Sequence, residues 1–178
     1  MGAQYLERHA HLNAAAARPR LTLAAIGVVG ALAVCLASVL QHRFDYQPCP
    51  WCVLQRLIVM VVAAIGLAAS LCRARLALAV AGGMAFMLSA TGVGVALYQH
   101  WVAARTASCN LTLADRIIGW LGLADLWPAM FEATARCDEA DRPWLGVPFS
   151  LWGATLFALL AVAAARALWQ TLAQRAPV

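Results

Sequence analysis

The sequence predicts an all-α integral membrane protein: a four-transmembrane-helix bundle with a short amphipathic surface helix in its long outer loop. The composition is 63% hydrophobic and 12% charged, and the charged share is about half that of a typical soluble domain. Four long segments that make up half of the chain contain no charged residue: 21–42, 57–72, 76–104 and 143–165. The segment Leu21–Leu40 is apolar on every side, whereas a helix of a soluble bundle keeps a polar side. The composition excludes a disordered chain and an ordinary nucleic-acid-binding domain, so we expect no nucleic-acid partner.

Four membrane spans follow from these segments in chain order. About 20 apolar residues, each adding ~1.5 Å, cross the ~30 Å hydrocarbon layer. The predicted spans cover about 21–41, 55–72, 76–98 and 148–166, with loops at 42–54 and 99–147. The membrane domain is therefore predicted at 21–168, between an N-terminal tail (1–20) and a C-terminal tail (169–178). We expect the glycine pairs of the third span, at 82–83 and at 92 and 94, to allow close helix packing.

The basic residues predict the orientation of the spans. Basic residues near span ends favour the cytoplasmic side. One side collects seven arginines against one acid, Glu7, whereas the long loop at 99–147 holds four arginines and six acids. We therefore expect both termini in the cytoplasm and both large loops outside, in the periplasm of a bacterial inner membrane. The seven arginines of the first side are Arg8, Arg18, Arg20, Arg73, Arg75, Arg166 and Arg175.

The long loop carries its own hydrophobic signal between residues 111 and 131. Large apolar side chains crowd this segment and are interrupted by Asp115, Arg116 and Asp125. Such a pattern is typical of short amphipathic helices that lie on a membrane surface. The alternative is a packed lid over the outer ends of the spans.

Four of the six cysteines lie in the predicted outer loops: Cys49, Cys52, Cys109 and Cys137. The outside of a bacterial inner membrane is oxidising, so paired cysteines there form disulfides. Cys49-Pro50-Trp51-Cys52 has the C-x-x-C spacing of labile redox disulfides. The remaining two cysteines, Cys35 and Cys72, lie within spans and are expected to be small packing residues.

Two other interpretations of the outer cysteines stay open. They could form two stabilising bridges, since a bridge between Cys109 and Cys137 would close a long loop. They could also hold one zinc ion, although zinc sites more often have two closely spaced pairs. We favour the redox interpretation and expect no metal site.

A redox role requires an electron acceptor, because cysteines can pass a disulfide among themselves but cannot be a net source of oxidation. A C-x-x-C at the membrane surface lies next to lipid-soluble quinones. The order of the cysteines therefore suggests a path from the thiols of a partner to the long-loop pair, then to Cys49 and Cys52, and finally to quinone.

Polar and aromatic residues near the outer span ends are candidates for this quinone site. Arg56 lies four residues after Cys52, on the same helix face, and a guanidinium there would favour a Cys52 thiolate and an anion on a reduced quinone. The alternative for Arg56 is an interfacial anchor. His100 ends the third span and could donate a hydrogen bond or a proton to a quinone oxygen. An interfacial aromatic belt is expected, with pocket lining as a second role, from Tyr46, Trp51, Trp101 and Trp144.

Taken together, these features resemble the DsbB family of bacterial inner-membrane disulfide-forming proteins. The likeness covers about residues 20–168 and rests on four spans, Cys49-Pro50-Trp51-Cys52 followed by Arg56, Tyr98-x-His100, and the two cysteines of one outer loop. Two departures are visible. Gln55 precedes Arg56 where an acidic residue is familiar, and the N-terminal tail is longer than expected.

The resemblance implies a quinone-dependent dithiol oxidoreductase and a role for each site residue. Cys109 would be attacked by a reduced periplasmic DsbA-like partner, and Cys137 would be its loop partner, able to form a transient bridge with Cys49. Cys52 would face the quinone, with Arg56 supporting the charge-transfer state of its thiolate and His100 near the quinone ring. The acceptor would be ubiquinone or menaquinone.

Other classes of protein would use parts of the same pattern. A thiol oxidase of the vitamin K epoxide reductase type usually places its C-x-x-C late, near the last span, whereas here the motif opens the second. A metal-binding membrane protein would use the outer cysteines as ligands, and a purely structural membrane protein would use them as stabilising bridges.

Overall fold

Four long helices form the body of the molecule, and each contains a segment long and apolar enough to cross a membrane. The computed structural model describes residues 2–105 and 112–173, with side chains from residue 17 onward. The long helices are α1 (Gly2–Phe44), α2 (Pro50–Leu71), α3 (Arg75–Trp101) and α8 (Phe149–Ala173). Their candidate spans are Ala17–Phe44, Pro50–Leu71, Arg75–Arg105 and Phe149–Ala173. The predicted all-α membrane bundle is confirmed, and the chain is a multi-pass membrane protein.

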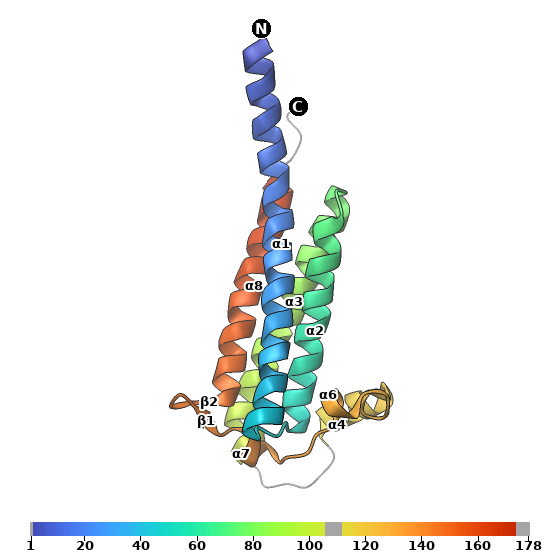
Figure 1. The fold of residues 1–178 in the computed structure, drawn as a ribbon, viewed down its shortest axis with the longest axis vertical. Coiled ribbons are helices and arrows are strands. Elements are labelled where there is room, and N and C mark those ends of the chain that lie inside the picture. The colour runs from blue at the N-terminus through green and yellow to red at the C-terminus, as the bar shows by residue number, and fades with distance from the viewer. Residues whose placement is uncertain (1, 106–111, 174–178) are drawn as a thin grey trace.

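The helices pack in two main pairs, α1 with α2 and α3 with α8, and α2 also packs against α3. Figure 1 shows the four helices side by side, with the start of α1 and the end of α8 at one end of the bundle and the loops between helices α1 and α2 and between α3 and α8 at the other. We call these the terminal end and the loop end. Two arginines link helices at the terminal end. Arg20 donates to the Ser70 carbonyl (2.9 Å), and Arg75 donates to the carbonyls of Thr171 and Leu172 (both 2.9 Å).

Close approach between helices depends on only some of the glycines. A Cβ at Gly66 would lie 2.6 Å from the carbonyl oxygen of Leu23, and one at Gly92 would overlap the Phe157 ring. Gly82 faces Leu168, 3.3 Å away, whereas Gly83 and Gly94 have nothing within 4 Å. The prediction that all four glycines of the third span serve packing is therefore wrong for two of them. Neighbouring helix positions differ by about 100° around the axis, so a pair of adjacent glycines cannot both face one partner.

Short elements fill the long loop at the loop end. They are η1 (Ala103–Arg105), α4 (Leu113–Trp120), α5 (Leu123–Leu126), α6 (Pro128–Phe131), α7 (Cys137–Ala140) and the strands β1 (Pro143–Trp144) and β2 (Val147–Pro148). Thr112 starts α4 with a capping box, because its hydroxyl accepts from the Asp115 N–H while the Asp115 carboxylate accepts from the Thr112 N–H. The strands form an antiparallel hairpin whose turn needs positive φ at Leu145 (54°) and Gly146 (81°).

Helices α4 and α6 lie beside the start of α2 rather than across the bundle (Figure 1). A small apolar cluster of Val53, Ile118 and Phe131 joins them to α2. Trp120 and Leu126, by contrast, are more than four-fifths exposed. An inner face packed on a span and an outer face of exposed apolar side chains are what the predicted amphipathic surface helix requires.

Candidate functional site

Three of the four predicted redox cysteines meet where α2 begins. Pro50 is the first residue of α2, a position that proline favours because it needs no N–H there. Cys49 is therefore the N-cap, fully buried, and Cys52 lies in the first turn. Their sulfur atoms are 3.0 Å apart, and the Cys49 sulfur also accepts from the Cys52 N–H (3.4 Å). The C-x-x-C thus belongs to the helix itself, which starts five residues before the predicted second span.

Cys137 reaches this pair because the loop before it is bound to the loop before Cys49. The carbonyl of Pro48 accepts from the N–H groups of Thr134 (3.0 Å) and Ala135 (3.2 Å). Cys137 then opens α7, which packs against η1 and α2. A hydrogen bond joins the Cys137 and Cys49 side chains. The three sulfur atoms therefore form a chain with Cys49 in the middle.

The hydrogen bond between Cys137 and Cys49 gives their two thiols different acidities. A hydrogen bond from Cys49 lowers the pKa of Cys137, although partial burial opposes the shift. The pKa of Cys49 is raised far above its usual range, first by its hydrogen bond with Cys137, then by the one with Cys52 and by burial. In the reduced state Cys49 therefore keeps its proton and donates it, while Cys137 is the better nucleophile. Cys109, the fourth predicted cysteine, lies outside the described residues.

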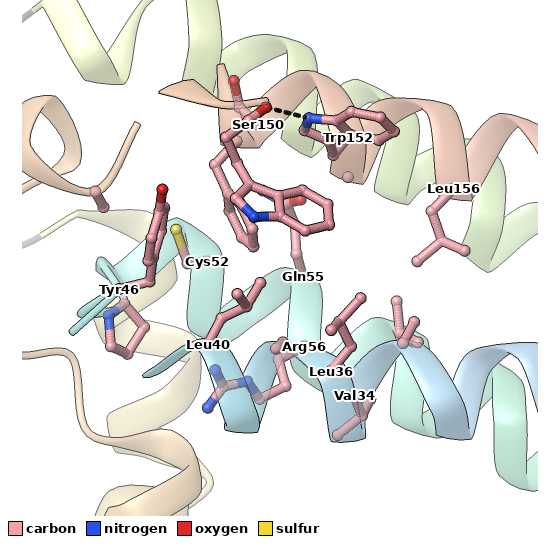
Figure 2. Close-up of a pocket in the computed structure, with 18 of the residues that line it drawn as sticks. Val34, Leu36, Leu40, Tyr46, Cys52, Gln55, Arg56, Ser150, Trp152 and Leu156 are labelled. Atoms are coloured by element: carbon pink, nitrogen blue, oxygen red, sulfur yellow. Dashed lines mark hydrogen bonds between the residues drawn. The ribbon is translucent and has the colours of Figure 1, made fainter. Parts of the chain in front are cut away.

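A cavity of about 260 Å³ opens beside Cys52, between α1, α2 and α8. Figure 2 shows Leu36 and Leu40 on one side of this space and Trp152 and Leu156 on the other, with Cys52 and Gln55 of α2 between them. The walls are mostly apolar, and the side chains that bring polar atoms include Cys52, Gln55, Arg56, Gln99 and Ser150. Such a cavity suits a largely apolar ring that carries a few polar atoms.

Aromatic side chains surround the loop end of this cavity. Of the four predicted belt residues, Tyr46 and Trp144 line the cavity, whereas Trp51 and Trp101 do not. Trp152 holds the hairpin in place, because its indole N–H donates to the Trp144 carbonyl (3.1 Å) and the two rings lie 5.4 Å apart. Tyr46 packs against the ring of Phe149, 5.8 Å away.

Arg56 is buried at the cavity wall, and its hydrogen bonds go to uncharged acceptors. It is 8% exposed, and one nitrogen, Nη1, lies 2.9 Å from both the side-chain oxygen of Gln41 and the carbonyl of Met130. Among the described residues, no carboxylate lies within ion-pair distance of Arg56. A buried cation without a counterion favours an anion in the space next to it.

Two glutamines that sequence reasoning did not select complete the surroundings of Cys52. Gln99 is 1% exposed, and its amide nitrogen donates to the Cys52 sulfur (3.1 Å). The amide nitrogen of Gln55 donates in turn to the Gln99 oxygen. The available signal was an uncharged polar residue at the boundary of a predicted span, next to Arg56 in one case and next to His100 in the other.

His100 does not line the cavity but is linked to it. Its Nδ1 lies 2.9 Å from the Asp141 carboxylate and 3.2 Å from the hydroxyl of Ser150, which does line the cavity. Asp141 also accepts from the Ser150 N–H (2.8 Å). The three residues join the ends of α3, α7 and α8. Among the side chains of residues 17–105 and 112–173, no three from His, Cys, Asp or Glu are grouped to hold a metal ion.

Comparison with known proteins agrees with this arrangement. The family described as Disulfide bond formation protein DsbB matches residues 19–167. A Disulfide bond formation protein B from Dechloromonas aromatica (strain RCB) is 34% identical over 139 residues, covering 75% of this chain and 81% of that protein. The protein of the same name from Aromatoleum aromaticum is 30% identical over 143 residues, covering 75% and 86%. No solved structure matches the chain significantly.

The family match covers α2, α3, the loop that carries Cys137 and the parts of α1 and α8 within residues 19–167, which includes every residue of the site described above. A membrane bundle with a C-x-x-C at a helix start and a third cysteine bound to it has the chemistry that forming disulfides requires. The chain belongs to the DsbB family of disulfide bond formation proteins.

Proposed function

We propose that this chain re-oxidises a periplasmic dithiol protein of the DsbA type and passes the electrons through its two cysteine pairs to a membrane quinone. The observation that supports this most is the position of Cys52. Its sulfur lies 3.0 Å from Cys49 on one side and forms part of an apolar cavity wall on the other. One residue thus connects the cysteine chain to a space suited to a lipid-soluble molecule.

The cavity fits a quinone ring by the chemistry of its walls. Apolar side chains from α1 and α8 face each other across it, and Arg56 supplies a positive charge with no carboxylate beside it among the described residues. A bound quinone supplies a two-electron, two-proton acceptor. His100, held by Asp141, and Ser150 are the groups we propose to move protons between the loop end and the cavity.

The steps before the quinone are thiol–disulfide exchanges. A thiolate of the partner attacks the disulfide of Cys109 and Cys137, and the second partner thiol completes the exchange. The partner then leaves oxidised, and both loop cysteines are reduced. A Cys137 thiolate next attacks the Cys49 sulfur of the Cys49–Cys52 disulfide, so that a Cys49–Cys137 bond forms and the electron pair leaves on Cys52. Cys109 then attacks Cys137, which restores the loop disulfide and leaves Cys49 and Cys52 reduced.

The test is quinone-dependent oxidation of a reduced DsbA-type protein by the purified chain in lipid nanodiscs. We expect one quinone to be reduced for each disulfide formed, measured by quinone absorbance and thiol titration. Ubiquinone and menaquinone are tested in parallel. Oxidation at the same rate without quinone, or none with either quinone, would contradict the proposal.

A second test separates the two cysteine pairs. Cys52→Ser is expected to abolish quinone reduction while Cys109 and Cys137 still trap the partner as a mixed disulfide, seen on a non-reducing gel. Cys72→Ser is the matched control, since Cys72 lies at the far end of α2. Normal quinone reduction by Cys52→Ser would show that Cys52 is not the residue that faces the quinone.

A further inference from the structure

Two buried amides stand between the C-x-x-C and the rest of the bundle. Gln55 lies on α2 and Gln99 on α3, at 9% and 1% exposure. Hydrogen bonds connect them in one direction, from the Gln55 amide nitrogen to the Gln99 oxygen and from the Gln99 nitrogen to the Cys52 sulfur. Burying an amide without a hydrogen-bond partner is unfavourable, so both side chains are held in this pairing.

The Gln55–Gln99 pair matters because it keeps the surroundings of Arg56 free of negative charge. Among the described residues that line the cavity, Arg56 alone carries a formal charge. A glutamate side chain would fit the same space as glutamine at either position, but a carboxylate would compensate Arg56 and would place an acceptor where the structure has a donor. Positions 55 and 99 are therefore both uncharged, and the Gln99 N–H points at the Cys52 sulfur.

We propose that Gln99 is a catalytic residue that stabilises the Cys52 thiolate with its amide N–H, and that Gln55 is a positioning residue that fixes the direction of the Gln99 amide. The proposal rests on the proposed function, in which Cys52 is the thiol that faces the acceptor. The N–H acts when the Cys49–Cys52 bond breaks. The attacking sulfur bonds to Cys49, the electron pair of the broken bond stays on Cys52, and no proton is transferred in that step.

The role of Gln55 follows from hydrogen-bond complementarity. Its amide nitrogen occupies the Gln99 oxygen, so the Gln99 nitrogen is the end left to face the sulfur. In Gln55→Glu the new carboxylate cannot donate. The Gln99 amide would then turn to donate to that carboxylate and would present its oxygen to Cys52. Gln55→Glu thus removes the hydrogen bond to the sulfur without altering any residue that touches it.

The experiment measures the reactivity of each cysteine in the fully reduced, quinone-free protein at pH 7. N-Ethylmaleimide is the probe, and the rate at each cysteine is read by mass spectrometry. We expect Gln99→Glu and Gln55→Glu to slow the labelling of Cys52 about tenfold or more, because a hydrogen bond to a charged group is among the stronger ones. The rates at Cys35 and Cys72 are internal references and stay unchanged.

Two matched variants separate the hydrogen bond from other effects of a new carboxylate. Gln170→Glu makes the same change at the terminal end of α8, where Gln170 accepts from Thr22, and is expected to leave the Cys52 rate unchanged. Gln41→Glu places a carboxylate against Arg56 but leaves both amides in place. A Gln55→Glu effect no larger than that of Gln41→Glu would overturn the role of Gln55.

The outcomes for Gln99 do not depend on quinone activity. An unchanged Cys52 rate in folded Gln99→Glu protein would overturn the proposal, and Gln99→Met, which removes the donor without adding charge, tests it again if Gln99→Glu does not fold. If the wild-type protein fails to reduce quinone but both glutamate variants slow Cys52, the proposed function fails while the role of the amides stands.

Discussion

Arg56 illustrates how a single buried charge can be kept available. Its hydrogen bonds go to Gln41 and to the carbonyl of Met130, which solvate the guanidinium without neutralising it. Both acceptors lie outside α2, one on α1 and one on α6. The arginine therefore holds the loop helices against the bundle and leaves its charge to the cavity.

We expect Arg56→Met to raise the apparent KM for quinone by about tenfold or more, because it removes a charged hydrogen-bond donor from the cavity wall. Arg56→Lys keeps the positive charge, so its apparent KM for quinone should lie between that of the wild-type protein and that of Arg56→Met. The measurement is quinone titration at saturating reduced partner. An unchanged KM for Arg56→Met would return Arg56 to the role of an interfacial anchor.

The pKa shift of Cys137 gives a prediction for pH dependence. Since the hydrogen bond from Cys49 lowers the pKa of Cys137, the thiolate of the reduced protein forms at a lower pH than that of an ordinary thiol. Cys49→Ala removes the donor, so the pKa of Cys137 should rise and its labelling at pH 7 should slow. Iodoacetamide labelling of Cys137 across pH, read by mass spectrometry, gives the midpoint. The same midpoint in both proteins would contradict the assigned cause.

At this scale the sequence indicated the cysteines and Arg56 but not their hydrogen-bond partners. Spacing marks a C-x-x-C, and a lone arginine in an apolar span is visible in the sequence. Gln99 and Ser150 became candidates only in the folded chain, because each bonds to a side chain 47 or 50 residues away. The Gln99 contact depends on which face of α3 meets α2, and the Ser150 contact on which face meets α8. An apolar span with no polar side gives little information on which of its faces meets a given neighbour.

Among the elements, the pairing of α1 and α2 depends on glycine. A Cβ at Gly66 would meet backbone atoms, the Leu23 carbonyl oxygen at 2.6 Å and the Gly27 nitrogen at 2.9 Å. Backbone cannot rotate away as a side chain can, so the two helices would have to separate.

We therefore expect Gly66→Ala to destabilise the bundle by about 1–3 kcal/mol, the usual range for overpacking. Gly94→Ala is the control within α3, because nothing lies within 4 Å of its Cβ and alanine favours a helix over glycine. Unfolding by denaturant in detergent micelles measures both. Equal stability of the two variants would mean that α1 and α2 do not pack as closely as described.

Hydrophobic runs were enough to predict the four long helices but not where α2 begins. The charge-free run begins only after Arg56, so the second span was predicted to start at Gln55. In the structure Arg56 lies inside α2 with acceptors from α1 and α6, and Pro50 starts the helix. Charge gaps locate the part of a helix that can face lipid, whereas caps and tertiary partners decide how far the helix extends.

For the whole molecule, the arginine distribution predicts which end faces the cytoplasm. Arg20 and Arg75 bind carbonyls at the terminal end, next to the start of α1 and the end of α8. The hairpin tip at Leu145, 77% exposed, lies at the loop end. The positive-inside rule therefore predicts that the loop end faces the periplasm.

Labelling of whole cells with a membrane-impermeant maleimide tests this orientation. In a variant without native cysteines, Leu145→Cys is expected to react in intact cells. A variant that keeps only Cys72, exposed at the other end of α2, is expected to react only after the cells are opened. Reaction of Cys72 in intact cells together with protection of Leu145→Cys would reverse the topology.

The placement of the C-x-x-C on the first turn of α2 has a wider consequence. Cys49 is hydrogen-bonded to Cys137 of the long loop, whereas Cys52 lines a mostly apolar cavity of about 260 Å³, too small for a protein to enter. Under the proposed function, the water-soluble dithiol partner and the lipid-soluble quinone therefore never need to meet directly. In the proposed function, one helical turn would connect two immiscible phases, and the chain would act as a phase-transfer catalyst whose carrier is the bond formed between Cys49 and Cys52.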